Sequence, residues 1–174
     1  GTSAVRAFPG GRWVMTIGVL TEATVWDTFT GDSFDLRAHR DVIVDAQIFP
    51  DGGRVITGST DMQAIIWDVQ GGRLLHVFLH RDPLAAVAVI GEGDRVATVT
   101  VYGKVFVWNA ELGGVLRSFG GHGAWHSGAC SVWALRPTTD LLVVSTLDGA
   151  RVWNWTSGSM LRRLGGEAQL GVLG

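Results

Sequence analysis

The sequence predicts an all-β protein made of four antiparallel four-stranded repeats. Three observations lead to this fold class: tryptophan recurs at a regular interval, the apolar runs are short, and the turns are rich in glycine. The 174 residues include 25 glycines and 8 tryptophans. Trp26, Trp67, Trp108 and Trp153 are separated by 41, 41 and 45 residues, which indicates that one structural unit is repeated four times.

Six positions of the repeat agree across the four copies, and such agreement is hard to produce by chance. Each of the four tryptophans follows a β-branched residue and precedes an acid or an amide. Large apolar residues stand eight residues after each tryptophan and eighteen residues before it. A glycine stands five residues after each tryptophan: Gly31, Gly72, Gly113 and Gly158. Each position therefore has a counterpart in the other three copies.

The second repeat illustrates the four strands of a unit. Residues 42–49 are apolar and rich in β-formers, and Pro50, Asp51 and two glycines then turn the chain. Three further runs follow, each bounded by turn residues: 54–59, 64–67 and 73–78. Runs this short are typical of strands rather than helices. The third repeat follows the same plan at 84–90, 95–100, 104–108 and 115–119.

A repeat of about 40 to 45 residues with four strands is typical of a β-propeller blade. A single blade buries little surface alone, so its faces must pack on neighbouring blades. Residues 1–174 are predicted to form a single propeller segment. Its blades are expected at 4–37, 42–78, 84–119 and 129–164, and a glycine-rich tail is expected at 165–174.

The pattern resembles the WD-repeat β-propeller family over nearly the whole chain. In that family a His before the first strand, a Ser or Thr on the second, an Asp in the next turn and the Trp form a hydrogen-bonded chain that locks each blade. The second blade matches at every position, with His39, Thr57, Asp61 and Trp67. The resemblance implies that Asp61 contributes to the stability of this blade.

The other three blades match the locking pattern only in part. Blade three keeps His80, Thr98 and Trp108, but Tyr102 stands where the Asp is expected. Blade one keeps Thr16 and Trp26, with Leu20 at the Asp position. Blade four has Asp148 and Trp153, and its His is His122 or His126, of which spacing favours His126, but its register slips by one residue and leaves the Ser or Thr unassigned. Only blade two is therefore expected to form the complete network.

The number of blades predicts an incomplete ring. Members of the family usually close a ring of about seven blades, and four are present here. An open stack leaves an apolar blade face at each end, which favours assembly. Three arrangements remain open: a piece of a longer propeller, two copies that pair into an eight-bladed ring, and a small closed ring of four blades.

The insertion that lengthens the last period is a candidate partner-binding loop. It covers residues 120–128 and contains His122, Trp125 and His126. An exposed Trp on such a loop is a typical hot spot for a protein partner, although Trp125 can also fold back onto the blade. His122, His126 and Cys130 are spaced by four, but glycines and a strand break the helix that a zinc site would need. No metal ligands are predicted.

Arg40 and Arg81 occupy the same position of the repeat, directly after the blade-locking His. They are expected on one face of the propeller near the mouth of its channel, where an acidic or phosphorylated peptide can dock. Asp41 and Asp82 follow them immediately and partly cancel the positive field. Solvated loop charges are the alternative interpretation.

Composition and motifs exclude several functional classes. Fourteen Lys and Arg against 16 Asp and Glu give a net charge of −2, which predicts no nucleic-acid partner and no membrane surface. Cys130 is the single cysteine, so no internal disulfide forms. No G-x-S-x-G motif is present. We therefore predict no catalytic residues, no cofactor, and a cytoplasmic or otherwise intracellular location.

The resemblance implies a non-catalytic protein-interaction scaffold that presents its loops and blade edges to other proteins or peptides. Its partners include the remaining blades of the same chain or a second copy of it. Two alternatives belong to other classes. One is a redox propeller enzyme that holds a quinone cofactor in its channel, and the other is the sensor or docking segment of a larger multidomain enzyme.

Overall fold

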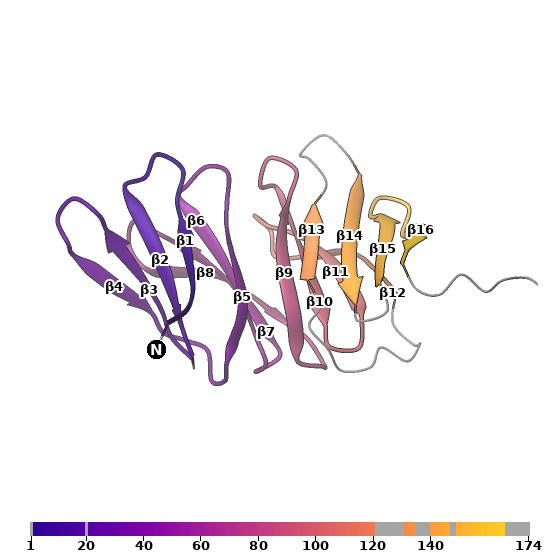
Figure 1. The fold of residues 1–174 in the computed structure, drawn as a ribbon, viewed down its shortest axis with the longest axis horizontal. Coiled ribbons are helices and arrows are strands. Elements are labelled where there is room, and N and C mark those ends of the chain that lie inside the picture. Colours follow the sequence, from indigo (N-terminus) through magenta and orange to yellow (C-terminus); the bar gives the residue numbers. More distant parts are fainter. Residues whose placement is uncertain (1, 20, 121–130, 135–139, 147–148, 166–174) are drawn as a thin grey trace, which may run out of the picture.

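The computed structural model describes residues 2–19, 21–120, 131–134, 140–146 and 149–165. Its described residues contain sixteen β-strands and no helix, so the predicted all-β fold class is confirmed. The strands form four antiparallel sheets of four strands each (Figure 1). Among the described residues, no helix is long and apolar enough to cross a membrane.

Each sheet contains four strands that are consecutive in the chain, and every strand pairs with its sequence neighbour. The first sheet comprises β1 (Thr2–Ala7), β2 (Trp13–Gly18), β3 (Ala23–Asp27) and β4 (Ser33–Leu36). The second comprises β5 (Ile43–Ile48), β6 (Arg54–Ser59), β7 (Gln63–Asp68) and β8 (Arg73–Leu79). The third comprises β9 (Leu84–Ile90), β10 (Arg95–Thr100), β11 (Lys104–Asn109) and β12 (Val115–Gly120). The fourth comprises β13 (Ser131–Ala134), β14 (Leu141–Thr146), β15 (Gly149–Asn154) and β16 (Ser159–Leu164).

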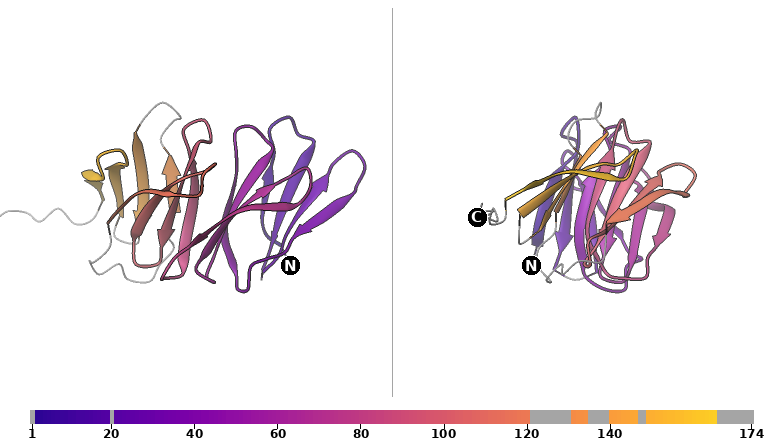
Figure 2. Two further views of the ribbon diagram at one scale, coloured as in Figure 1. Left: turned by 180° about the vertical axis from the view of Figure 1, so that it is seen from behind. Right: turned by 90° about the vertical axis from the view of Figure 1, so that its right-hand side faces the viewer.

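The four sheets stack face to face in chain order, and Figure 2 shows the same order from behind. Three apolar cores fill the three spaces between neighbouring sheets. Met15 and Trp67 belong to the core between blades one and two, and Phe78 and Trp108 belong to the next one. The third core lies between blades three and four and includes Phe119. No blade thus depends on its own sheet alone for burial.

Side chains of β5 join the innermost strands of blades two and three. The backbone N–H of Val87 donates to an Asp45 carboxylate oxygen at 3.1 Å. The N–H of Val89 donates to the Gln47 side-chain oxygen at 3.2 Å. These N–H groups lie on the free inner edge of β9, so the two side chains satisfy backbone donors that no neighbouring strand pairs.

The stack is open, because the first and fourth sheets lie at its opposite ends (Figure 1). This arrangement is not the small closed ring of four blades. Two repeat positions reveal the uncovered faces. Trp67 and Trp108 are 3% and 9% exposed, whereas their counterpart Trp26 in blade one is 42% exposed. Phe119 is 7% exposed, whereas its counterpart Leu164 in blade four is 46% exposed.

The open end faces predict self-association of the 174-residue chain. Exposed apolar faces of this kind pair to remove Trp26 and Leu164 from water, so light scattering after size exclusion should give a mass above 18.6 kDa. The double variant Trp26→Lys and Leu164→Lys should shift the mass towards the monomer. Leu116→Lys is the matched control, because Leu116 is an exposed residue of the outer strand β12. A wild-type monomer would contradict this prediction.

Candidate functional site

Four side chains of blade two form one continuous hydrogen-bonded chain. The indole N–H of Trp67 donates to Thr57 Oγ1 at 2.9 Å, and Thr57 Oγ1 lies 2.8 Å from His39 Nε2. His39 Nδ1 lies 3.0 Å from the carboxylate of Asp61. Because a carboxylate only accepts, Nδ1 carries the proton and Nε2 accepts from the Thr57 hydroxyl. Each N–H or O–H donor of these hydrogen bonds then has an acceptor.

Asp61 also ties two chain segments together through backbone groups. Its carboxylate accepts from the N–H of Arg40 at 2.8 Å and from the N–H of Gln63 at 3.0 Å. The connection that enters β5 is thereby fastened to the turn between β6 and β7. Burial lowers the pKa of His39, and hydrogen bonding and charge from Asp61 oppose this shift. The neutral ring with one proton on Nδ1 is the form that this arrangement needs.

Blade three keeps the hydrogen bonds between Trp, Thr and His, but a backbone carbonyl replaces the aspartate. Thr98 Oγ1 lies 2.7 Å from His80 Nε2 and accepts from the indole N–H of Trp108 at 2.9 Å. His80 Nδ1 lies 3.1 Å from the carbonyl oxygen of Phe78, which takes the place of the aspartate. Tyr102 stands outside the network with 59% of its surface exposed. A backbone carbonyl therefore orients this histidine.

Blade one retains only the tryptophan and the hydroxyl of the chain. The indole N–H of Trp26 donates to Thr16 Oγ1 at 2.9 Å. Thr16 Oγ1 in turn donates to the carbonyl oxygen of Thr24 at 3.4 Å. Leu20, at the aspartate position, lies outside the described residues.

In blade four the hydroxyl position is occupied by Val144. Val144 pairs with Arg151 across the sheet, as Thr57 pairs with Ile65 in blade two. β14 and β15 are separated in the sequence by one residue fewer than β6 and β7, which explains the slipped register. The indole N–H of Trp153 is buried and has no hydrogen-bond partner among the described residues. His126 and Asp148 lie outside those residues.

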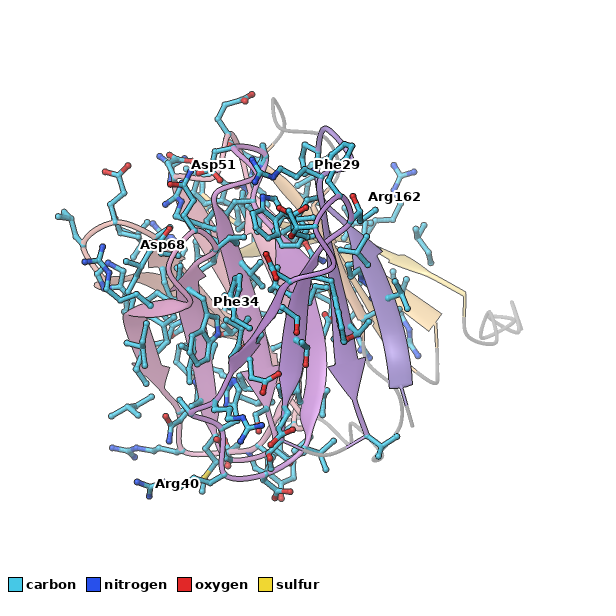
Figure 3. The ribbon with its side chains drawn as sticks, turned by 90° about the vertical axis from the view of Figure 1, so that its left-hand side faces the viewer. Phe29, Phe34, Arg40, Asp51, Asp68 and Arg162 are labelled. Atoms are coloured by element: carbon cyan, nitrogen blue, oxygen red, sulfur yellow. The ribbon has the colours of Figure 1, made fainter. Side chains whose placement is uncertain are left out.

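The structure brings Arg40 and Arg81 to the same end of the sheets, on either side of the β6–β7 turn. The N–H of Arg40 is bound to Asp61, and the N–H of His80, next to Arg81, donates to the carbonyl oxygen of Met62 at 2.9 Å. Both arginines are exposed, and Figure 3 shows Arg40 at the opposite end of the molecule from Asp51. The loop candidates His122 and Trp125 lie outside the described residues.

Sequence reasoning missed Met62, which lies in the middle of this end of blade two. Its φ of 68° is the one positive value among the described residues other than glycine. Gly103, with φ 71°, stands five residues before Trp108, as Met62 stands five residues before Trp67. The repeat alignment thus contained the signal, because a methionine occupies a position where a turn favours glycine.

A cavity of about 630 Å³ lies along the innermost strands β1, β5, β9 and β13. Arg6 is the one cation and Asp45 the one acid among its described lining residues. Burial raises the pKa of Asp45.

This cavity is where the alternative redox function would place a quinone cofactor. A quinone would need several convergent charged groups and a metal. Among the described residues, no group of three or more His, Cys, Asp or Glu could hold a metal ion.

Comparison with known proteins identifies the fold. Residues 32–68, which include His39, Thr57, Asp61 and Trp67, match the family model for the WD40 repeat (WD domain, G-beta repeat). The structure is similar to those of U3-55K and of the RRP9 WD40 repeats, each with a TM-score of 0.79 and 19% sequence identity. The chain has the fold of a WD40 propeller. The resemblance to the WD-repeat family is thereby confirmed.

Both WD40 comparisons also bear on how complete the ring is. Each covers 92% of this chain but 50% of the solved structure, so the chain spans about half the length of the propellers that it matches. This agrees with the open stack and with the predicted incomplete ring. No curated protein matches the sequence.

Removal of the Asp61 carboxylate should destabilise blade two. In Asp61→Ala, His39 loses its acceptor and two backbone N–H groups lose theirs, so the free energy of unfolding should fall by about 1–3 kcal/mol. Urea unfolding measures this change. Asp32→Ala is the control, because Asp32 lies in an exposed turn. Equal midpoints for the two variants would remove the argument that Asp61 locks the blade.

Restoration of the missing hydroxyl should stabilise blade four. Val144→Thr places an acceptor near the buried Trp153 N–H, which has no partner among the described residues, so the free energy of unfolding should rise by about 1 kcal/mol. Thr57→Val makes the reverse change in blade two and should lower it. Val143→Thr is the control, because Val143 points to the other face of the same strand. A gain from Val143→Thr as large as that from Val144→Thr would contradict the assignment.

Acid should weaken blade three through His80. Burial between aromatic rings lowers the pKa of His80 from 6.5 to about 4, so between these values the unfolded chain binds a proton that the folded chain refuses. Stability is therefore retained above pH 6.5 and falls as the pH drops towards 4, by about 2 kcal/mol at pH 4.5. Urea unfolding above pH 6.5 and at pH 4.5 measures this loss of stability. His80→Gln should make the free energy of unfolding less dependent on pH. An equal dependence in wild type and variant would contradict the prediction.

Proposed function

We propose that this WD40 propeller segment acts as a non-catalytic protein-interaction scaffold. The observation that carries the proposal is the rigid attachment of exposed loops at one end of blades two and three. The buried network of His39, Thr57, Asp61 and Trp67 holds the turn beside Arg40. Groups held in position before binding lose little conformational entropy when a partner docks.

The proposed partners are other proteins or peptides. Arg40 and Arg81 are exposed and make no ion pair with the described residues, which leaves their guanidinium groups available for carboxylates. His122 and Trp125, which lie outside the described residues, remain candidates. The net charge of −2 argues against nucleic acid and anionic membranes as partners, and an intracellular location accompanies the proposal.

The open end faces extend the proposal to blade-like partners. Trp26 and Leu164 occupy positions that a neighbouring blade covers elsewhere in the stack. The remaining blades of the same chain or a second copy of it have the chemistry to cover them. The scaffold then consists of the completed propeller, with the described loops on one of its faces.

Site-specific photo-crosslinking tests the scaffold function. The photoreactive residue p-benzoylphenylalanine replaces Arg40, Arg81 or Trp125, and the chain is irradiated in an extract of its own cells. Discrete adducts with other proteins are expected from these loop positions. The same residue at Leu116, an exposed position of the outer strand β12 in an inner blade, is the control. A pattern of adducts from the loop positions that does not differ from the Leu116 pattern would contradict the proposal.

A further inference from the structure

The turn between the third and fourth strands of each blade carries the repeated glycine, and in three blades the preceding blade covers this turn. A Cβ placed on these glycines would lie 2.9, 3.2 and 3.3 Å from an outer-strand side chain of that blade. The pairs are Gly72 with Phe34, Gly113 with His76, and Gly158 with Arg117. Gly31, their counterpart in blade one, has no atom of the described residues within 4 Å. Blade one therefore presents this turn to solvent.

Arg162 of blade four is the other free half of the same contact. It pairs across the sheet with Val152, the residue before Trp153. The three covering side chains also pair with the residue before their repeated tryptophan: Phe34 with Val25, His76 with Ile66, and Arg117 with Val107. Arg162 is exposed on the last blade (Figure 3). Blade four thus presents a covering residue, and blade one presents a turn of the kind that is covered elsewhere.

Arg117 shows what an arginine does at this position. Its Nη1 donates to the carbonyl oxygen of Ser157 at 3.3 Å, and Ser157 directly precedes Gly158. Thr30 directly precedes Gly31 in blade one. An arginine that covers the Gly31 turn as Arg117 covers its own therefore has the Thr30 carbonyl oxygen as its acceptor.

The apolar contacts between blades are divided between the two ends in the same way. An outer-strand phenylalanine lies against the repeated tryptophan of the next blade, with ring centroids 4.9 Å apart for Phe78 and Trp108 and 5.1 Å apart for Phe119 and Trp153. Leu36 has the place of these phenylalanines in blade one and shares a core with Trp67. A leucine thus fills this place as well, and the members left exposed are Leu164 and Trp26.

The two end faces are therefore complementary halves of one contact that the chain makes three times within itself. An interface between two different faces forms a closed ring when its rotation closes. The length of the chain indicates how many copies such a ring needs. The propellers that the chain matches are about twice as long, because 92% of this chain corresponds to 50% of each of them. Two copies supply that length.

We propose that two copies of this chain close an eight-bladed ring in which blade four of each copy packs on blade one of the other. The inference rests on the proposed function, which includes a second copy among the partners, and it specifies the interface. At each of the two junctions Arg162 donates to the Thr30 carbonyl oxygen, and Leu164 covers Trp26. The cavity along β1, β5, β9 and β13 then becomes half of a channel that both copies enclose.

Solution mass and a charge variant test the ring. Light scattering after size exclusion should give a single species of twice 18.6 kDa. Arg162→Glu should raise the dissociation constant of the dimer at least tenfold, because a carboxylate cannot donate to the Thr30 carbonyl. Arg73→Glu is the matched control, because Arg73 is an exposed arginine on the outer strand of an inner blade. It should leave the dissociation constant unchanged. Far-UV circular dichroism checks that both variants remain folded.

Thiol crosslinking tests the predicted junction directly. Thr30→Cys and Arg162→Cys are prepared as separate chains in a Cys130→Ser background, mixed, and treated with bis(maleimido)ethane. A crosslink between the two chains is expected. Arg117→Cys with Ser157→Cys in one chain is the positive control, because it reproduces the same contact inside the chain. Leu112→Cys mixed with Arg162→Cys is the negative control, because Leu112 lies in the exposed β11–β12 turn of an inner blade.

Three results would overturn the two-copy ring. They are a monomer, a series of species larger than the dimer, and a dimer in which Thr30→Cys fails to crosslink to Arg162→Cys while the positive control does. A monomer would leave further blades as the occupants of the end faces, and larger species would indicate an open filament. None of these results would decide the scaffold function, because its loops lie on blades two and three and are tested by their own photo-crosslinks.

Discussion

A four-stranded sheet cannot bury both of its faces within itself, and the rest of this structure depends on that constraint. The chain meets it by repetition, since each blade presents an apolar face to the blade before it and another to the blade after it. Trp67 and Trp108 are buried because a neighbouring blade packs on them, and Trp26 is exposed because no described blade packs on that face of blade one. The same constraint makes the two ends of the stack the natural places for further blades or a second copy.

The hydrogen-bonded chain acts within one blade, whereas the apolar packing acts between blades. It joins the tryptophan of the third strand, the hydroxyl of the second and the connection that enters the first. In blade two it reaches Asp61 and, through Asp61, the backbone of Arg40. The buried network of blade two therefore positions the exposed loop that carries Arg40. The stability of this blade is thereby linked to the loop that is proposed to bind a partner.

The unequal completion of the networks has a physical pattern. Blade three substitutes a backbone carbonyl for the aspartate at little cost, because His80 needs only an acceptor for its Nδ1 proton. Blade four lacks the hydroxyl itself, and the Trp153 N–H is then buried without a partner among the described residues. An unpaired buried donor costs about 1–3 kcal/mol, so the locks differ in strength even though the four sheets share one topology.

The sequence by itself determined the repeat and the strand order, because these depend on spacing and on local turn chemistry, and its resemblance to the WD-repeat family implied the side chains of the blade-two lock. The recurring Trp and Gly positions suffice to predict the repeat and its strand order, because consecutive antiparallel strands pair through short turns. Tertiary structure alone decided that the stack is open, that Val144 occupies the hydroxyl position, and that Met62 lies between two arginines. The open stack and the place of Met62 depend on contacts between segments distant in the chain, and the place of Val144 depends on the register in which β14 pairs with β15.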